Sequence, residues 1–418
     1  YKSCRAEALD TILERAKTCR QCNDPTCIRH CPARVDIPKF VGHIVAGQFR
    51  AAYETLREAN VLAAVCGYVC PAETLCEAGC INQHYSTAVP IRHLQRWISR
   101  LAVEEGWAAE PRTAAAPSGK QVAVLGAGPA GVAAAATLAA LGHAVTIFEG
   151  SGAAGGTAGD TIPAERLPDP IMTREMQDVL SSSGAVTFRQ ARLSSGYNLD
   201  SVMAERFDAV LIALGLTKST RLPGVRPGQG VEGALEFLKR TKAGQKIAGD
   251  VLVLGGGNAA IDAAMAAKKA GASDVSIVYR RSFAEMPAWP AERDSAVRAG
   301  IHFLILTSPM TYVADSEGNL TALKVVRTRL GDAGADSRRV PLPIADSEHL
   351  IPSDLIVEAI GQEVGEELNG ALPGLRFTER GFLWTREGSL ETSRRGVFAA
   401  GDIVNGGTTV VQAVAEGK

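Results

Sequence analysis

The sequence predicts an α/β fold in which a small helical domain precedes two repeats of strand, glycine-rich turn, helix and strand. All nine cysteines lie among the first 80 of the 418 residues. Two glycine motifs, beginning at Gly126 and Gly255, each follow a short apolar run and open an alanine-rich one. A composition with 43 glycines, 46% hydrophobic and only 5% aromatic residues is typical of this class. The length fits two or three domains of about 150 residues each.

Charge and hydropathy exclude several classes of protein. Lys and Arg number 44 and Asp and Glu number 45, and the net charge of -1 excludes a strongly basic nucleic-acid binder or an acidic disordered tail. Every long apolar stretch is interrupted by a charge or turn residue, so no membrane span is expected. The opening YKSCRAEALD lacks the apolar core of a signal peptide. We therefore expect a cytoplasmic protein that binds no nucleic acid.

The cysteine-rich segment, roughly residues 1–106, contains two patterns with helical spacing. Residues 38–60 carry large apolar side chains at that spacing, with a break predicted at Gly47. Residues 90–107 form a second predicted helix, with its apolar side chains on one stripe. The small residues and prolines of AAEPRTAAAPSGK, residues 108–120, are typical of a domain linker.

After the linker, two βαβ units predict two dinucleotide sites in separate domains. The first is QVAVLGAGPAGVAAAATLAALGHAVTIFEG and the second is DVLVLGGGNAAIDAAMAAKKAGASDVSIVYRR. A single G-x-G-x-x-G motif can be an ordinary glycine-rich turn. Two such motifs, each between an apolar strand and a helix, favour nucleotide binding.

The first motif consists of Gly126, Gly128 and Gly131. Gly126 permits the tight turn, Gly128 lets the backbone approach a pyrophosphate, and Gly131 lets the helix pack on the strand. Glu149 ends the second strand, where a carboxylate accepts hydrogen bonds from a ribose. The alternative for Glu149 is an ordinary solvated residue at a strand end.

The second motif consists of Gly255, Gly257 and Ala260. Aligning VTIFE with VSIVY places Tyr279 opposite the acidic residue of the first unit, followed by Arg280 and Arg281. Two guanidinium groups in that place suit a 2′-phosphate, so NADP(H) is favoured over NAD(H). A pair of solvated surface arginines is the alternative.

The other eight cysteines after Cys4 form two groups whose spacing favours iron–sulfur ligation over zinc. The first group reads C-x2-C-x4-C-x3-C-P from Cys19 to Pro32, and the second reads C-x3-C-P-x4-C-x3-C from Cys66 to Cys80. Bacterial ferredoxins close a cysteine run with C-P in the same way. Structural zinc sites commonly use C-x2-C, which the second group lacks.

The N-terminal segments resemble a known iron–sulfur domain. CRQCNDPTCIRHCPARVDIPKF, VCGYVCPAETLCEAGC and IRHLQRWISR resemble the N-terminal domain of dihydropyrimidine dehydrogenase, of its bacterial flavin subunit and of the glutamate synthase small subunit. The resemblance implies two [4Fe-4S] clusters and leaves Cys4 and Cys66 as non-ligands. It assigns one cluster to Cys19, Cys22, Cys27 and Cys80, and the other to Cys31, Cys70, Cys76 and Gln95.

Gln95 also stands out from the residues alone. It lies on the apolar stripe of its predicted helix, three residues before Ile98 and seven before Ala102. A polar side chain there needs a partner, which is either a cluster iron or the backbone. Glutamate synthase relatives usually carry Glu at this position, so Gln95 favours the dihydropyrimidine branch, whereas YRRSFAEMPA, residues 279–288, favours the glutamate synthase branch.

The C-terminal RRGVFAAGDIVNGGTTVVQAV resembles the flavoproteins with two dinucleotide-binding domains, the glutathione-reductase-like fold. The resemblance implies that Gly401 and Asp402 bind FAD and that a helix beginning near Thr409 points at the isoalloxazine. It implies an NAD(P) domain inserted in a discontinuous FAD domain: a double-cluster domain at 1–113, FAD parts at 114–222 and 363–418, and the NAD(P) domain at 223–362. Near the flavin, GGTAGDTIPAERLP keeps Arg166 but has Asp160 and Glu165 in place of the family's aromatic residues.

Together these features predict an electron-transfer subunit in which NAD(P)H, FAD and two clusters carry the chemistry, with no catalytic side chain assigned. We expect a catalytic redox partner subunit, such as that of glutamate synthase, dihydropyrimidine dehydrogenase or an aldehyde- or oxo-acid-oxidising complex, or a ferredoxin-like subunit. A self-contained NAD(P)H:ferredoxin or quinone reductase is the alternative. Intact glycine motifs argue against a pure interaction module.

Overall fold

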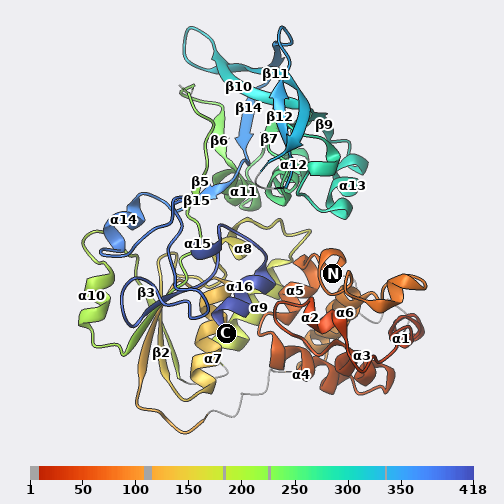
Figure 1. Cartoon of the computed structure of the whole chain (residues 1–418), viewed down its shortest axis with the longest axis vertical. Helices are drawn as coiled ribbons and strands as arrows, with labels where there is room; N and C mark the ends of the chain where they lie inside the picture. Colours follow the sequence, from red (N-terminus) through yellow and green to blue (C-terminus); the bar gives the residue numbers. More distant parts are fainter. Residues whose placement is uncertain (1–8, 108–114, 182–184, 225–226, 335–336) are drawn as a thin grey trace. The chain divides into compact units, whose positions relative to one another are not determined.

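The computed structural model describes residues 9–107, 115–181, 185–224, 227–334 and 337–418 (Figure 1). The chain forms two compact units, one made of residues up to 159, 164–216 and 364–418, the other of residues 160–163 and 217–363. The predicted α/β fold is confirmed, and the domain boundaries at 113, 222 and 362 stay predictions. Cys4 and most of the predicted linker lie outside the described residues.

The N-terminal part of the first unit is helical, as predicted. The helix predicted over 38–60 is broken around Gly47, and the helix predicted over 90–107 spans 91–104. Phe40, Ile44, Leu56 and Ile98 are fully buried in its core. The helices are α1 (Leu9–Lys17), α2 (Thr26–Arg29), α3 (Ile37–Val45), α4 (Phe49–Ala59), α5 (Ala63–Val69) and α6 (Ile91–Glu104).

A five-stranded parallel sheet forms the rest of the first unit, in the order β16-β4-β1-β2-β3. The edge strand β16 comes from the end of the chain, so this domain is discontinuous. The strands are β1 (Gln121–Leu125), β2 (Ala144–Glu149), β3 (Val186–Gln190), β4 (Ala209–Ile212) and β16 (Val397–Ala399). The helices are α7 (Pro129–Ala140), α8 (Gly156–Thr161), α9 (Asp169–Ser181), α10 (Leu199–Ala204), α14 (Glu367–Ala371), α15 (Asp402–Asn405) and α16 (Val410–Gly417).

The second unit repeats this topology in a parallel sheet ordered β6-β14-β7-β8-β9. The central strand VLVL is buried on both faces, as its uninterrupted apolar run predicts. The strands are β6 (Val231–Gly233), β7 (Val251–Leu254), β8 (Val275–Tyr279), β9 (His302–Ile305) and β14 (Leu355–Glu358). The helices are α11 (Ala234–Lys242), α12 (Asn258–Ala270) and α13 (Pro290–Arg298).

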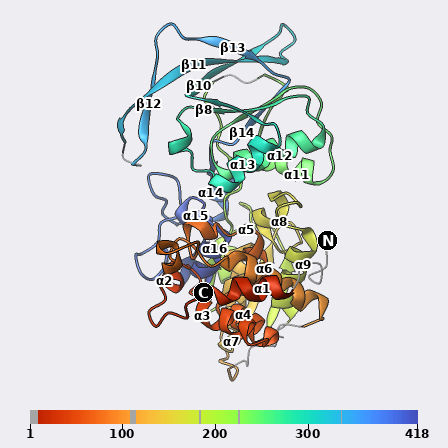
Figure 2. The same cartoon turned by 90° about the vertical axis from the view of Figure 1, so that its right-hand side faces the viewer.

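A four-stranded antiparallel sheet, which the sequence reasoning did not anticipate, covers one face of this parallel sheet. Successive side chains of a strand point to opposite faces, so Val251 and Val253 pack with the helices whereas Leu252 and Leu254 pack with the antiparallel sheet. Figure 2 shows helices α11–α13 on one side of this unit and the antiparallel strands on the other. The strands are β10 (Thr307–Ala314), β11 (Leu320–Ala333), β12 (Arg339–Pro343) and β13 (His349–Pro352).

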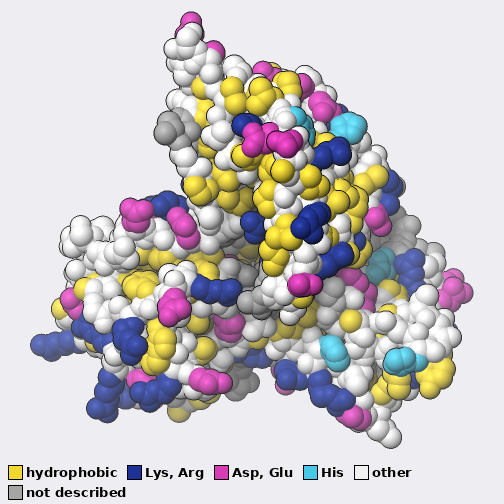
Figure 3. All heavy atoms as spheres, turned by 45° about the horizontal axis from the view of Figure 1, so that its top comes forward, with side chains coloured by type: hydrophobic (Ala, Val, Ile, Leu, Met, Phe, Trp, Pro, Cys, Tyr) yellow, Lys and Arg dark blue, Asp and Glu magenta, His cyan; other side chains and the backbone are white. Residues whose placement is uncertain are grey.

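The surface carries both signs of charge. On the face shown in Figure 3, Lys and Arg side chains lie among Asp and Glu side chains, in keeping with the net charge of -1. Among the described residues, no helix combines the length and the apolar character needed to cross a membrane.

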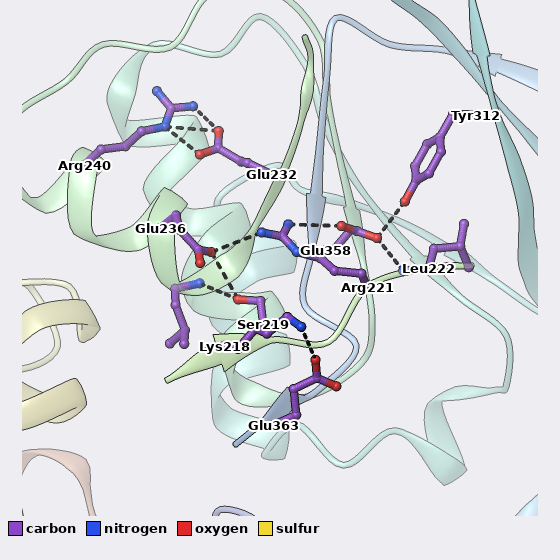
Figure 4. Close-up of polar contacts among 11 residues, drawn as sticks. Lys218, Ser219, Arg221, Leu222, Glu232, Glu236, Arg240, Tyr312, Glu358 and Glu363 are labelled. Atoms are coloured by element: carbon purple, nitrogen blue, oxygen red, sulfur yellow. Dashed lines mark hydrogen bonds and ion pairs between the residues drawn. The ribbon is translucent and has the colours of Figure 1, made fainter. Parts of the chain in front are cut away.

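Two short antiparallel strands, β5 (Lys218–Ser219) and β15 (Gln362–Glu363), stand where the chain enters and leaves the second unit. Beside them, the carboxylate of Glu358 is fully buried at the end of β14 (Figure 4). It accepts hydrogen bonds from the Leu222 backbone N–H at 2.5 Å, from the Tyr312 hydroxyl at 2.6 Å and from Arg221 Nη1 at 3.1 Å. Glu358 therefore ties the entering segment to the outgoing strand and to β10.

Candidate functional site

Four cysteine side chains from distant parts of the helical domain line one cavity. Cys19, Cys22, Cys27 and Cys80 share its walls with the apolar side chains of Ile37, Val89 and Ile91, among others. Cys19, Cys22 and Cys27 come from one loop and α2, and Cys80 is the last cysteine of the second group. The structure thus brings together the set that the resemblance assigned to one cluster.

The electrostatics of these thiols follow from their closeness and burial. Burial raises the pKa of the Cys27 thiol to about 11, and neighbouring Cys80, Cys19 and Cys22 add to the rise. Burial also raises the pKa of Cys19, with Cys22 and Cys80 contributing. In the part of the chain that the structure describes, no three His, Cys, Asp or Glu side chains converge closely enough to share a single metal ion. A cubane cluster spreads its thiolates over four separate irons, so this spacing is compatible with it.

Three of the remaining described cysteines, Cys31, Cys66 and Cys76, lie more deeply buried than the four that line the cavity. Burial raises the pKa of the Cys70 and Cys76 thiols, and each is raised further by Cys31. Cys66 is also near Cys31 and Cys70 and lies fully inside the protein, where the Asn60 side chain hydrogen-bonds to its thiol. Proximity alone therefore does not separate Cys66 from the three predicted ligands.

Gln95 lies on α6, beside the start of α5. Its side-chain nitrogen Nε2 donates to the backbone carbonyl of Ala63 at 2.6 Å. α5 and α6 pack so closely that a Cβ on Gly67 would stand 3.0 Å from Arg96 Cα. The backbone bond left open as the alternative for Gln95 is thus present, and it engages the amide nitrogen. Ligation through the amide oxygen stays a prediction.

The first glycine motif forms a tight turn between β1 and α7. Gly126 has φ +107°, and a Cβ there would stand 2.4 Å from the Ala213 carbonyl oxygen. A Cβ on Gly131 would stand 2.0 Å from the Gly126 carbonyl oxygen, so helix and turn approach too closely for any side chain. Gly128 precedes α7, and among the described residues a Cβ placed on it would meet Gly156 Cα alone within 4 Å. This loop has the cradle that a pyrophosphate requires.

Glu149 lies at the end of β2 and supports this loop. Its Oε2 accepts from the Ala127 backbone N–H at 2.9 Å, and its Oε1 accepts from the backbone N–H and the hydroxyl of Ser151 at 2.8 and 3.0 Å. The carboxylate therefore joins the glycine loop to the turn after β2, and its bond to a ribose stays a prediction. Arg166, the remaining predicted flavin residue, is half-buried before α9.

The C-terminal segment returns to the same helix end. A Cβ on Gly401 would stand 3.1 Å from Ala130 Cβ, at the first turn of α7. Asp402 accepts from the Thr408 backbone N–H at 3.3 Å; burial raises its pKa and nearby Glu416 adds to the rise. Thr409 is the N-cap of α16, and its hydroxyl accepts from the Gln412 N–H at 3.2 Å. The helix therefore begins where the sequence predicted.

The second glycine motif has the same form as the first. Gly255 has φ +134°, and a Cβ there would stand 2.3 Å from the Ala359 carbonyl oxygen. Gly257 faces open space before α12, and Ala260 is fully buried in the first turn of that helix. Tyr279 ends β8 and packs against Gly256, so it does occupy the position of the acidic residue in the first unit.

The two arginines after β8 have different surroundings. Arg280 is exposed, whereas Arg281 is buried and donates from Nε to the Arg339 carbonyl oxygen at 2.7 Å. The Arg339 side chain in turn donates to Glu285 at 2.6 Å, and Glu285 accepts from the Ser282 backbone N–H at 3.3 Å. The turn that carries Arg280 is thus held from both sides, partly by β12 of the antiparallel sheet.

These sites define a class of protein. Thiols around one cavity suit an iron–sulfur cluster, and two glycine cradles at helix starts suit two dinucleotides, so the chain is a pyridine-nucleotide oxidoreductase with an iron–sulfur domain. Residues 2–107 match the family model for dihydropyrimidine dehydrogenase domain II, 4Fe-4S cluster. Residues 120–417 match the model for pyridine nucleotide-disulphide oxidoreductases.

Two relatives are similar to this chain over nearly its whole length. The glutamate synthase [NADPH] small chain of Azospirillum brasilense is 33% identical over 97% of this chain and 86% of its own length. The NAD-dependent dihydropyrimidine dehydrogenase subunit PreT of Escherichia coli is 33% identical over 97% of this chain and 92% of its own length. The chain belongs to this family of FAD- and [4Fe-4S]-containing NAD(P)H oxidoreductases.

Two further similarities extend the comparison. The NADP(+)-dependent formate dehydrogenase subunit beta of Moorella thermoacetica is 35% identical over 94% of this chain, which spans 58% of that protein. Among solved structures, Mycobacterium tuberculosis FprA in complex with NADPH has a TM-score of 0.60 at 17% identity, over 72% of this chain and 83% of its own. Thioredoxin reductase of T. acidophilum has a TM-score of 0.51 at 20% identity, over 71% of this chain and 95% of its own. These structures show the two-dinucleotide-domain fold.

Sequence reasoning missed three supporting carboxylates. Glu416 accepts from the Gly401 backbone N–H at 2.8 Å and from the side-chain nitrogens of Asn405 and Gln412 at 3.0 Å. Glu285 organises the turn after β8, and Glu175 joins α9 to the helical domain. Each of these carboxylates has at least one hydrogen-bond partner that lies far from it in the sequence. Two local signals were available, the Ser282–Glu285 spacing of a capping box and the four-residue spacing of Gln412 and Glu416 on α16.

Proposed function

We propose that this chain passes electrons between NAD(P)(H), FAD and two [4Fe-4S] clusters, to or from a catalytic partner subunit. The observation that carries the proposal is the occurrence in one chain of a cavity walled by four cysteines and two glycine cradles at helix starts. When bound, these cofactors supply the two-electron and one-electron redox chemistry. The chain's own residues hold the phosphates, brace the loops and set the positions of the cofactors.

The proposed roles follow the contacts of each residue. Gly126, Gly128 and Gly131 let the FAD pyrophosphate approach the start of α7. Glu149 braces that loop and lies toward the ribose. Asp402, in the segment that returns to the same helix end, is proposed to bind the ribityl chain of FAD. For NAD(P), the corresponding part is the loop from Gly255 to Ala260. FAD parts at 114–222 and 363–418 around an NAD(P) part at 223–362 remain our proposed division, and the cytoplasmic setting remains a prediction.

Anaerobic titration with NADPH tests this function as a whole. We expect the flavin absorbance to bleach first and EPR signals of reduced clusters to follow, because electrons enter at the nucleotide site. A flavin that is reduced while both clusters stay oxidised in the absence of any added acceptor would contradict the proposal. A colourless purified protein would contradict it outright.

Two clusters per chain are expected to give about eight irons and eight sulfides, with one FAD. The eight proposed ligands are Cys19, Cys22, Cys27 and Cys80 for one cluster, and Cys31, Cys70, Cys76 and Gln95 for the other. Iron, acid-labile sulfide and flavin analysis of anaerobically purified protein measures this directly. About four irons, or zinc in their place, would overturn the assignment.

The proposed preference for NADP(H) rests on Arg280, whose guanidinium is exposed just past the end of β8. Charged hydrogen bonds contribute about 1.5–3 kcal/mol, so Arg280→Ala should weaken NADPH binding about 10- to 100-fold and leave NADH binding nearly unchanged. Flavin bleaching at low concentrations of each nucleotide gives both affinities.

Two variants control this measurement. Arg298→Ala removes an exposed arginine at the end of α13, in the same unit, and should change neither affinity. Arg281→Ala removes a buried guanidinium that holds Arg339, so it should weaken both nucleotides together. If wild-type flavin is bleached by less NADH than NADPH, the preference is wrong.

The partner subunit is proposed because the matched regions of this chain leave no separate region for a substrate domain. The cluster, FAD and NAD(P) regions occupy nearly all of its residues, which leaves no separate region within it for a substrate domain. Native co-purification with mass spectrometry identifies the partner. Recovery of the chain alone, fully active toward free ferredoxin or quinone, would favour a self-contained reductase instead.

A further inference from the structure

A buried carboxylate on α9 joins the flavin-binding part of the first unit to the helical cysteine domain. Glu175 is 3% exposed. Its Oε1 accepts from Arg57 Nη1 at 2.7 Å and from the Ala64 backbone N–H at 2.8 Å, and its Oε2 accepts from the Val65 backbone N–H at 2.8 Å. All three donors belong to the helical domain, whereas α9 packs against α7 and β3.

The element that Glu175 holds is α5, which leads directly to the second cysteine group. The residue before the helix, Leu62, makes no side-chain cap, so the first backbone N–H groups of α5 depend on Glu175. The other end of α5 is followed by Cys70, a proposed cluster ligand. The flank of α5 packs against α6, the helix of Gln95, where a Cβ on Gly67 would stand 3.0 Å from Arg96 Cα. Thus α5 is fixed at its start by the flavin-binding part and at its flank by the helix of the proposed fourth ligand.

Simple stabilisation does not account well for this arrangement. Burial raises the pKa of Glu175, against the opposing effects of Arg57 and the two backbone N–H groups. Buried ion pairs are weak contributors to stability, and well-packed apolar residues often do as well or better. A directional contact of this kind does, however, fix the position of one element relative to another.

We propose that Glu175 is a positioning residue for electron transfer, which fixes α5 and the proposed ligand Cys70 relative to the flavin-binding part of the unit. The proposal rests on the electron-transfer function given above and deepens it. Glu175 touches no proposed cofactor ligand through its own side chain. It acts through the backbone of α5 and through Arg57, which also donates to the Val61 carbonyl oxygen.

Glu175→Gln tests the proposal with little change in size. The amide keeps one acceptor oxygen but loses the charge and one of the backbone partners. We expect FAD and both clusters to be retained. Removing one partner of a buried charged pair should increase hydrogen exchange of the Ala64 and Val65 amides by about 100-fold. Displacement of Cys70 changes the electron path to its cluster, so reduction of the second cluster after rapid mixing with NADPH should be slower than in the wild type.

EPR provides a readout that does not depend on activity. The signal of the cluster at Cys31, Cys70 and Cys76 should shift or broaden, whereas the signal of the cluster at Cys19 should stay unchanged. Asp178→Asn is the matched control, because Asp178 lies on the same helix and pairs with Arg174 at 3.8 Å near the surface. It should change neither the exchange of α5 nor the EPR signals.

The outcomes separate cleanly. Faster exchange of α5 with an unchanged EPR signal and transfer rate would overturn the positioning role and leave a structural one. If the Glu175→Gln protein does not retain its cofactors, the Arg57→Lys protein is tested instead. It should show the same changes in exchange, EPR signal and transfer rate, but smaller ones. If wild-type flavin does not reduce the clusters at all, the proposed function fails, while exchange and EPR still decide the role of Glu175.

Discussion

Replacing Gln95 by Leu should remove or convert the cluster proposed at Cys31, Cys70 and Cys76, while the cluster proposed at Cys19, Cys22, Cys27 and Cys80 survives. Leu has no atom that binds iron, and it also breaks the bond to Ala63. Loss of one cubane lowers the iron content from about eight to about four per chain. Iron analysis and EPR of the dithionite-reduced protein measure the change.

Cys66→Ser distinguishes this assignment from a simple division of four cysteines to each cluster. The Cys66 thiol is buried near Cys31 and Cys70, so it is the obvious competitor for the fourth position. Under the proposed assignment it binds no iron, and both clusters should remain. If the Cys66→Ser protein loses a cluster and the Gln95→Leu protein keeps both clusters, the proposed ligand set is refuted.

Replacing Glu358 by Ala should destabilise the second unit by about 3–5 kcal/mol, because it leaves the partly buried Arg221 and two other donors without their acceptor. Hydrogen exchange of the β7 and β14 amides in the full-length holoprotein measures the loss within this unit. Exchange in the parallel sheet of the first unit should change far less.

Glu363 provides a matched control for this prediction. It lies five residues further along the same outgoing segment and pairs with Lys218 at 3.2 Å, but both side chains are about two-fifths exposed (Figure 4). Exposed ion pairs contribute about 0–1 kcal/mol, so Glu363→Ala should be close to neutral. Equal effects of the two substitutions would show that burial of Glu358 has no special weight.

Much of the fold could be predicted because buried parallel strands are short and uninterrupted apolar runs, as in VLVL of β7. The antiparallel sheet could not be predicted in the same way. In β12, RVPLP, no side chain is fully buried, so there is no apolar run to recognise. Its position depends on pairing with β11, which follows from tertiary contacts rather than from local pattern.

In the candidate site, too, the residues with local partners could be predicted and those with distant partners could not. Gly131 and Thr409 could be predicted because their roles depend on neighbours within a few residues. Glu175 could not, because its backbone partner Ala64 is 111 residues away. Arg280 and Arg281 lie in the bend after β8, and Arg281 is buried beside Arg339, 58 residues further along the chain, so no local pattern distinguishes the two arginines.

The discontinuous sheet of the first unit has a consequence for the order in which the protein matures. The second unit has all five of its parallel strands once residue 358 has been synthesised, whereas the first sheet lacks its edge strand until β16 at 397–399. Glu416 and its bond to Gly401 come later still. Since domains fold as units during synthesis at about 5–20 residues per second, the nucleotide domain should be folded before the flavin cradle can close. We therefore expect FAD to load late, and nascent chains to bind the pyridine nucleotide before they bind flavin.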